Sequence, residues 1–215
     1  MTTRTRLTPG ERRAQLLDLG AQLFAEQPYD QVRIERVAEL AGVSRGLLYH
    51  YFPTKRAFFV ELLRRESERI TERTAPDPDL PPLDQLRHGI DGFLANCRGR
   101  MHGAQAVFRG TASADPDVQA IIDRGSAEQT RRILAAVSPG EEPHPLLGIT
   151  VRSWLLFLRS ACFEWLENGS SADQEEVREL AVGALVGAFL ALPRYARPAL
   201  VDELTLSGPP GSRTT

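Results

Sequence analysis

Residues 41–57, AGVSRGLLYHYFPTKRA, carry many hydrogen-bond donors in a short stretch. Leu48 and Phe52 are four residues apart, so in a helix they share one face and can be buried together. Arg45 and the polar-tipped rings of Tyr49 and His50 then fall on other faces, where their donors are accessible. Clustered donors and cations suit recognition of an anionic partner better than they suit catalysis.

Two short helices joined by a tight turn must position these donors. The spacing of apolar residues predicts a helix over 34–41, and Gly42 permits the positive φ of a tight turn. Ser44 is a suitable N-cap for a second helix over 45–51. This arrangement is the helix-turn-helix pattern, which places the start of its second helix in the major groove of double-stranded DNA.

The pattern assigns a DNA contact to each exposed side chain. Arg45 can donate two parallel hydrogen bonds to guanine, and Gly46 lets the backbone approach closely. Leu47 can meet a thymine methyl group, and Lys55 can hold a phosphate in the first turn of the next helix. The expected donors near the phosphates are Tyr49, His50 and Tyr51, although Tyr51 has packing against the first helix as an equal alternative.

The order A-G-V-S-R-G-x-L-Y-x-Y-F-P-x-K, preceded by I-x-x-V-A-x-x-A, closely resembles the DNA-binding domain of TetR-family transcriptional regulators over about residues 8–63. The resemblance implies an all-helical homodimer with a C-terminal ligand-binding and dimerisation domain. Most such proteins are repressors that a small molecule releases from a palindromic operator. The family's DNA contacts correspond here to Ser44, Arg45, Gly46, Leu47, Tyr49, His50, Tyr51 and Lys55.

Two positions depart from the family pattern. Arg33 stands where the second helix usually has a Thr or Ser cap, and it cannot cap a helix but can reach a phosphate. Leu47 stands where the family more often has a small or hydroxylated residue. We expect Leu47 to shift the preferred DNA sequence without abolishing binding.

Helix signals dominate the chain, so an all-α fold is predicted, with a three-helix N-terminal helix-turn-helix domain and a larger C-terminal helical domain. Capping signals occur at Thr8 with Glu11, at Thr54, at Asp115-Pro116 and at Ser171 with Gln174. The proline-rich stretch 75–83 is the expected boundary. The predicted helices are 9–26, 34–41, 45–51, 55–74, 84–99, 101–110, 116–137, 145–168 and 172–192, and the predicted domains are 1–74 and 75–205, with a disordered tail over 206–215.

Charge and composition agree with a cytoplasmic protein that contacts a polyanion at one end. Residues 1–59 hold nine Lys and Arg against six Asp and Glu, whereas the whole chain has a net charge of −2. The two cysteines allow at most one disulfide, and the chain opens with no secretory leader. The apolar run 180–193 is shorter than the roughly 20 residues that span a bilayer, so it is predicted to be a buried helix.

The C-terminal domain is expected to bind a small-molecule effector of unknown identity in an apolar cavity. An arginine could anchor an anionic ligand, and Arg152 and Arg159 are seven residues apart on one helix face. A salt bridge from these arginines to Glu175 or Glu179 at an interface is the favoured alternative. The predicted ligand-binding residues are Phe93, Cys97, Met101, Phe108, Trp154, Phe157, Arg159 and Phe163, each of which is also a plain core candidate.

The last two long helices are predicted to form the homodimer interface. Gly183 and Gly187 are four residues apart and create a small-residue face that admits another helix. The helix over 145–168 carries Val151, Trp154, Leu158, Cys162 and Trp165 at near-heptad spacing. Helix packing within one subunit explains the same pattern.

Other functions find little support. No nucleophile and base pair, phosphate-binding loop or metal-ligand spacing occurs, so the chain is predicted not to be an enzyme and to need no cofactor or metal. His50, His88, His102 and His144 are scattered. A DNA-binding regulator without a ligand, whose C-terminal body serves only dimerisation or protein interaction, remains the alternative.

Overall fold

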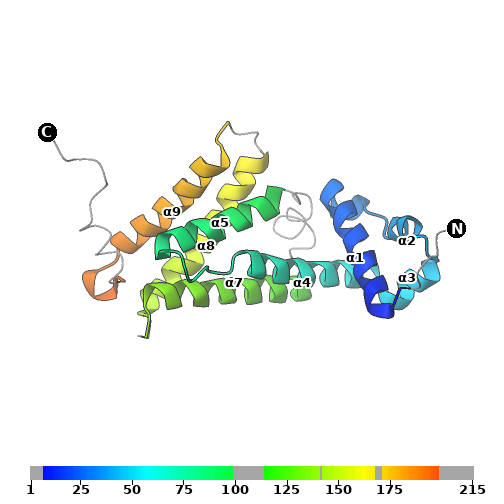
Figure 1. The fold of residues 1–215 in the computed structure, drawn as a ribbon, viewed down its shortest axis with the longest axis horizontal. Coiled ribbons are helices and arrows are strands. Elements are labelled where there is room, and N and C mark those ends of the chain that lie inside the picture. Colours follow the sequence, from blue (N-terminus) through cyan, green and yellow to red (C-terminus); the bar gives the residue numbers. More distant parts are fainter. Residues whose placement is uncertain (1–6, 99–113, 141, 168–170, 199–215) are drawn as a thin grey trace. The chain divides into compact units, whose positions relative to one another are not determined.

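A computed structural model describes residues 7–98, 114–140, 142–167 and 171–198 (Figure 1). These residues form helices joined by short connections, and no strand occurs among them. The predicted all-α class is therefore confirmed. The predicted helix over 101–110 and the tail over 206–215 lie outside the described residues.

The observed helices follow the predicted order closely. Boundaries agree to within two residues, and the last helix begins at Gln174 instead of residue 172. The elements are α1 (Pro9–Glu26), the 3-10 turn η1 (Tyr29–Gln31), α2 (Glu35–Ala41), α3 (Arg45–Tyr51), α4 (Lys55–Arg73), α5 (Pro82–Arg98), α7 (Pro116–Val137), α8 (Pro145–Glu167), α9 (Gln174–Leu190) and the 3-10 turn η3 (Arg194–Ala196).

Local capping fixes where these helices begin. The predicted capping box of α1 is present: the backbone N–H of Glu11 donates to the Thr8 hydroxyl, and the Glu11 carboxylate accepts from the Thr8 N–H at 2.7 Å. The hydroxyl of Thr54 accepts from the N–H of Ala57 at 3.0 Å. The carboxylate of Asp115 accepts from the N–H of Asp117 at 2.9 Å. Each interaction satisfies a donor that the first turn of a helix leaves unpaired.

The predicted capping box at Ser171 and Gln174 is wrong. Asp173 is the N-cap of α9, and its carboxylate accepts from the backbone N–H of Glu176 at 2.9 Å. The indole N–H of Trp165, on α8, donates to the carbonyl of Ala172 at 2.8 Å. That carbonyl therefore accepts a hydrogen bond from α8 instead of one from the first turn of α9. Because of this tertiary contact, α9 is capped by Asp173, the next residue that is able to cap a helix, and not by Ser171.

The chain divides into two compact units. One comprises Met1–Ile70 with Asn96–Asp123, and the other comprises Thr71–Ala95 with Arg124–Thr215. The division predicted from the proline-rich stretch, into 1–74 and 75–205, remains a prediction.

The first unit is built around aromatic side chains that α1, α3 and α4 contribute. The rings of Phe52 and Phe58 meet edge to face with their centroids 4.7 Å apart, and the centroids of Phe24 and Phe59 are 5.1 Å apart. Val118, from the first turn of α7, is buried in the same core. Large buried aromatic residues contribute strongly to the stability of so small a unit.

In the second unit, α8 packs along α9. Val151, Leu158 and Cys162 are buried, and the indole N–H of buried Trp154 donates to the carbonyl of Ala181 at 2.8 Å. The heptad-like stripe of α8 therefore packs within its own chain, which is the alternative to its predicted role in the dimer interface.

The outer sides of the same helices are also apolar. Ile149 and Leu156 on α8 are 53% and 60% exposed, and Leu180 on α9 is 58% exposed. By length and composition α8 could cross a membrane. The buried residues along one side of α8 indicate a core helix. The apolar residues on its other side form an exposed surface of the kind that binds another molecule.

Candidate nucleic-acid interface

The turn between α2 and α3 has the predicted geometry. Gly42 has φ 63°, in the left-handed region that favours glycine, and the N–H of Val43 donates to the carbonyl of Ala38 at 3.0 Å. The hydroxyl of Ser44 accepts from the N–H of Leu47 at 3.1 Å and caps α3. These local bonds fix the angle at which α3 leaves the turn.

Two buried residues hold α3 against the first unit. Leu48 is 0% exposed and Phe52 is 2% exposed, which confirms the predicted inner face of the helix. Ser44, Arg45, Gly46, Tyr49 and His50 are exposed. Leu47 and Tyr51 are partly buried, and Tyr51 packs against the core. The packing alternative for Tyr51 thus has direct support.

Gly46 has no packing partner that requires a glycine. An added Cβ would meet only the Ser44 hydroxyl, 3.9 Å away, which is an ordinary van der Waals distance. A helical glycine costs about 1 kcal/mol relative to alanine, because it loses more backbone entropy on folding. The described part of the chain gives no internal reason for that cost, which points to a partner that approaches the backbone from outside.

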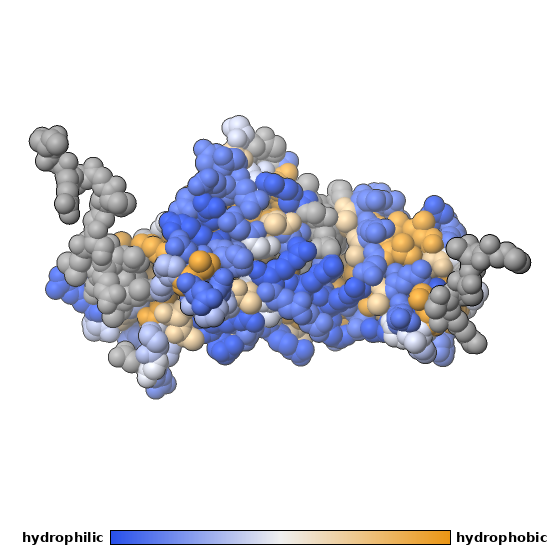
Figure 2. All heavy atoms as spheres, in the orientation of Figure 1, coloured by the Kyte–Doolittle hydropathy of each residue, from blue (hydrophilic) through white to orange (hydrophobic). Residues whose placement is uncertain are grey.

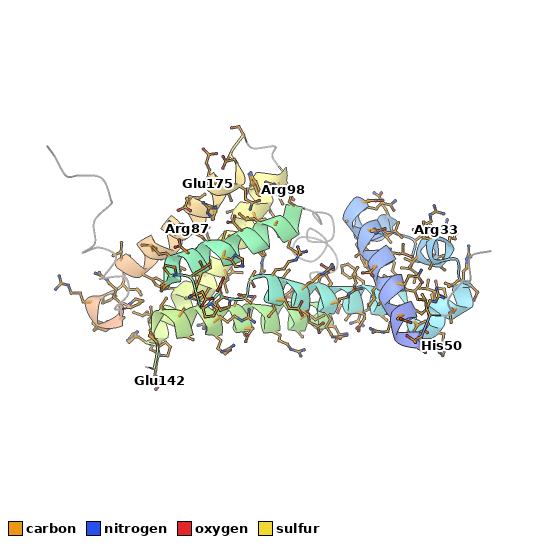
Figure 3. All side chains as sticks on the ribbon, viewed as in Figure 1. Arg33, His50, Arg87, Arg98, Glu142 and Glu175 are labelled. Atoms are coloured by element: carbon orange, nitrogen blue, oxygen red, sulfur yellow. The ribbon has the colours of Figure 1, made fainter. Side chains whose placement is uncertain are left out.

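Arg45 and Arg33 are exposed cations on this unit, and neither guanidinium group has a hydrogen bond or ion pair to another described residue. Figure 3 shows Arg33 beside α2 and His50 on α3. No side chain caps α2, since its N-cap is Ile34. The sequence-based expectation that Arg33 does not cap this helix is therefore confirmed.

Lys55 is held more firmly than the sequence suggested. Its ammonium lies 4.6 Å from the centre of the Tyr29 ring and donates to the carbonyl of Asp30 at 3.4 Å. Partial burial lowers the pKa of Lys55, while Asp30 and Glu35 oppose that effect. A lysine that is already oriented loses less entropy when it binds a phosphate.

A contact between α2 and α3 was not foreseen from the sequence. The hydroxyl of Tyr49 donates to the carboxylate of Glu35 at 2.6 Å. The hydrogen bond raises the pKa of Tyr49 and lowers that of Glu35. The two residues are 14 positions apart, so only the turn geometry reveals that they meet.

A second unforeseen contact joins α4 to the start of α7. The guanidinium of Arg56 donates to both carboxylate oxygens of Asp115, at 2.6 and 2.8 Å, and to Asp117 at 2.6 Å. This fork raises the pKa of Arg56 and lowers that of Asp115. Arg56 immediately follows Lys55, so the ion pairs also restrain the first turn of α4.

A polar groove of about 550 Å³ lies between the end of α1 and α2. Figure 2 shows hydrophobic atoms over α2, where Leu40 is 46% exposed. The groove includes none of the predicted ligand-binding residues. It is lined by Gln22, Leu23, Glu26, Gln27, Gln31, Val32, Arg33, Arg36, Glu39 and Leu40.

The predicted ligand-binding residues do not all lie in one environment. Cys97, Trp154 and Phe163 are buried and Phe93 is partly buried, whereas Phe157 is 39% exposed. Met101 and Phe108 lie outside the described residues.

The structure also describes the two arginines that were predicted to anchor an anionic ligand, Arg152 and Arg159. Arg159 donates to the hydroxyl of Ser126 at 3.4 Å, and Arg152 is exposed. Glu179 accepts from Arg87 at 2.9 Å, and Glu175 accepts from Arg178 at 3.0 Å. Figure 3 shows Arg87 on α5 and Glu175 on α9. Both proposed acidic partners are thus engaged by other arginines of the same chain.

Comparison with known proteins agrees with this geometry. Residues 16–62 match the family model described as bacterial regulatory proteins, tetR family. The chain is 30% identical to the HTH-type transcriptional repressor KstR of Rhodococcus jostii, over 82% of this chain and 84% of that protein. It is 25% identical to the HTH-type transcriptional activator FasR of Mycolicibacterium smegmatis, over 87% of each.

A solved structure is similar along nearly the whole chain. The crystal structure of a tetR-family transcriptional regulator from Streptomyces coelicolor has a TM-score of 0.85 and 26% identity. The alignment covers 94% of this chain and 92% of that one. The similarity thus extends well beyond the helix-turn-helix.

Proposed function

This chain belongs to the tetR family of bacterial regulatory proteins and is a DNA-binding transcriptional regulator, and we propose that it acts as a homodimeric repressor which a small molecule releases from a palindromic operator. Membership of a family of regulators also agrees with the expectation that it is not an enzyme. KstR is named a repressor and FasR an activator. The higher identity to KstR supports repression.

The observation that carries the proposal is the exposed side of α3. The helix is anchored by Leu48 and presents Arg45 at its N-terminal end, next to a glycine that packing does not require. Arg45 can donate to guanine O6 and N7 in the major groove. The nearby Lys55 supports a phosphate contact, which would set the register of the domain on the duplex.

Dimerisation is proposed through the outer sides of α8 and α9. Exposed Ile149, Leu156 and Leu180 are an apolar surface that a second copy can cover. An added Cβ at Gly183 or Gly187 would meet nothing within 4 Å, so the backbone of α9 is open to close approach by another helix. A two-fold dimer presents two copies of α3 and therefore favours a palindromic operator.

A ligand site is proposed in the second unit, near the buried residues Trp154 and Phe163, with Arg159 as the polar anchor. A ligand can release the protein from DNA only if it binds the DNA-free state more tightly. Arg159→Ala should then abolish induction and leave DNA affinity intact. Loss of dimerisation in that variant would assign Arg159 to the interface.

The direct test is selection of bound duplexes from random DNA with the purified protein, repeated with Arg45→Ala. We expect the wild type to enrich one palindrome and the variant to relax the preference for guanine at one position of each half-site. Enrichment of no sequence at moderate salt would refute sequence-specific regulation. We propose a cytoplasmic location, where such DNA is accessible.

A further inference from the structure

The hydrogen bond between Glu35 and Tyr49 places a carboxylate among cations on the proposed DNA-binding surface. Glu35 lies in the first turn of α2 and Tyr49, which is 38% exposed, lies on α3. Their oxygens are 2.6 Å apart, a short distance typical of a hydroxyl that donates to a carboxylate. The pair therefore links the two helices of the motif on their outer side.

The carboxylate of Glu35 is ionised at neutral pH. Its pKa is lowered first by the hydrogen bond from Tyr49, then by its own backbone N–H, and less by the charges of Arg33 and Arg45. Both arginines are predicted to contact DNA. A fixed negative charge near these two arginines opposes the approach of a phosphate.

The same bond limits what Tyr49 can do. A tyrosine hydroxyl has one proton, and here it is given to Glu35. Its remaining lone pairs cannot bond a phosphate oxygen, which is also an acceptor. Tyr49 in this arrangement therefore cannot act as the phosphate donor that the sequence suggested, and its ring is held in one orientation instead.

We propose that Glu35 is a specificity-determining residue: it holds Tyr49 in place and disfavours non-cognate DNA by setting a negative charge on the recognition surface. This inference rests on the proposed function and deepens it. Binding to unrelated DNA depends almost entirely on phosphate contacts and has no fixed register. Phosphates then approach Glu35 in many arrangements, whereas base contacts by Arg45 at the operator fix one register that avoids it.

Glu35→Gln isolates the charge, because the amide oxygen can still accept from Tyr49. Glu68→Gln is the matched control, since Glu68 is an exposed glutamate on α4 outside the recognition surface and its replacement changes the net charge equally. Tyr49→Phe removes the hydroxyl and keeps the charge of Glu35. Glu35→Ala is a second variant that removes both the charge and the acceptor.

Affinity is measured for the selected operator and for an unrelated duplex of equal length, across a series of salt concentrations. Glu35→Gln should bind the unrelated duplex about three- to tenfold more tightly, gain less on the operator, and release about one more counterion per protomer. Glu35→Ala should behave likewise. Glu68→Gln should leave binding to the unrelated duplex within about twofold of wild type, and Tyr49→Phe, which keeps the charge of Glu35, should not show the gain of Glu35→Gln.

Unchanged affinity and salt dependence in both Glu35 variants would overturn the inference. An equal gain in Glu68→Gln would also overturn it, because net charge alone would then explain the effect. Failure of the wild-type protein to select any operator is a separate result that overturns the proposed function itself. Thermal unfolding of each variant shows that the comparison is made between folded proteins.

Discussion

Replacing Gly46 with alanine should make the folded protein more stable and its DNA binding weaker. The added methyl group has room in the free protein, since its nearest neighbour outside the helix backbone would be the Ser44 hydroxyl at 3.9 Å. Alanine in a helix is favoured over glycine by about 0.5 to 1 kcal/mol, mainly because alanine has less backbone conformational entropy than glycine in the unfolded chain. The free energy of unfolding should rise by about that amount.

The effect on DNA binding should have the opposite sign. If the first turn of α3 lies against the edges of the bases, a methyl group at residue 46 keeps the backbone away from the groove. A loss of about tenfold in affinity, or about 1.4 kcal/mol, is expected for one misplaced recognition helix. Fluorescence anisotropy with the selected operator measures this loss, and urea unfolding measures the gain in stability.

Gly89→Ala is the matched control for this pair of measurements. Gly89 lies within α5, where an added Cβ would make an ordinary contact of 3.7 Å with the carbonyl of Thr74. This variant should be at least as stable as the wild type and bind the operator equally well. If Gly46→Ala also bound with unchanged affinity, the argument that DNA approaches the backbone of α3 would be wrong.

Three further predictions concern packing, charge and assembly. Gly20→Ala should destabilise the first unit by about 1 to 3 kcal/mol in urea unfolding, because its Cβ would overlap the buried ring of Phe58. Arginine partners lower the pKa of Glu179 from 4.5 to about 2, so its contribution to stability is complete above about pH 4.5 and is lost as the pH falls towards 2. Glu179→Gln should therefore cost more stability in urea unfolding at pH 6 than at pH 3, and an equal cost at both would contradict this assignment. Leu156→Glu should turn the proposed dimer into a monomer in sedimentation velocity experiments, because it buries a charge in the α8 and α9 interface.

Features that depend on neighbouring residues were predictable from the sequence. The capping box at Thr8 and Glu11 and the cap at Ser44 each join atoms three residues apart, so the pattern of residues determines the contact. The positive φ of Gly42 follows in the same way from the need for a tight turn. Because these signals are consecutive, they also determine which face of α3 is buried.

Features that depend on tertiary contacts were not predictable. Both Ser171 and Asp173 are good capping residues, and the hydrogen bond from Trp165 to Ala172 separates them only once α8 and α9 are packed. The apolar positions of α8 likewise form an inner and an outer face. Spacing identifies both faces as helical, but it does not say which one packs on α9 and which is left for a partner.

The same distinction explains why the recognition surface could be predicted in composition but not in its internal bonding. The guanidinium group of Arg45 has no hydrogen bond or ion pair to another described residue, whereas the hydroxyl of Tyr49 donates to Glu35 and the ammonium of Lys55 contacts Tyr29 and Asp30. A long flexible cation can adjust to base edges, while oriented groups around it set the position of the helix. The residues that restrain Tyr49 and Lys55 come from α2 and from the turn before it. Specificity in this motif should therefore depend on residues outside α3 as well as on Arg45.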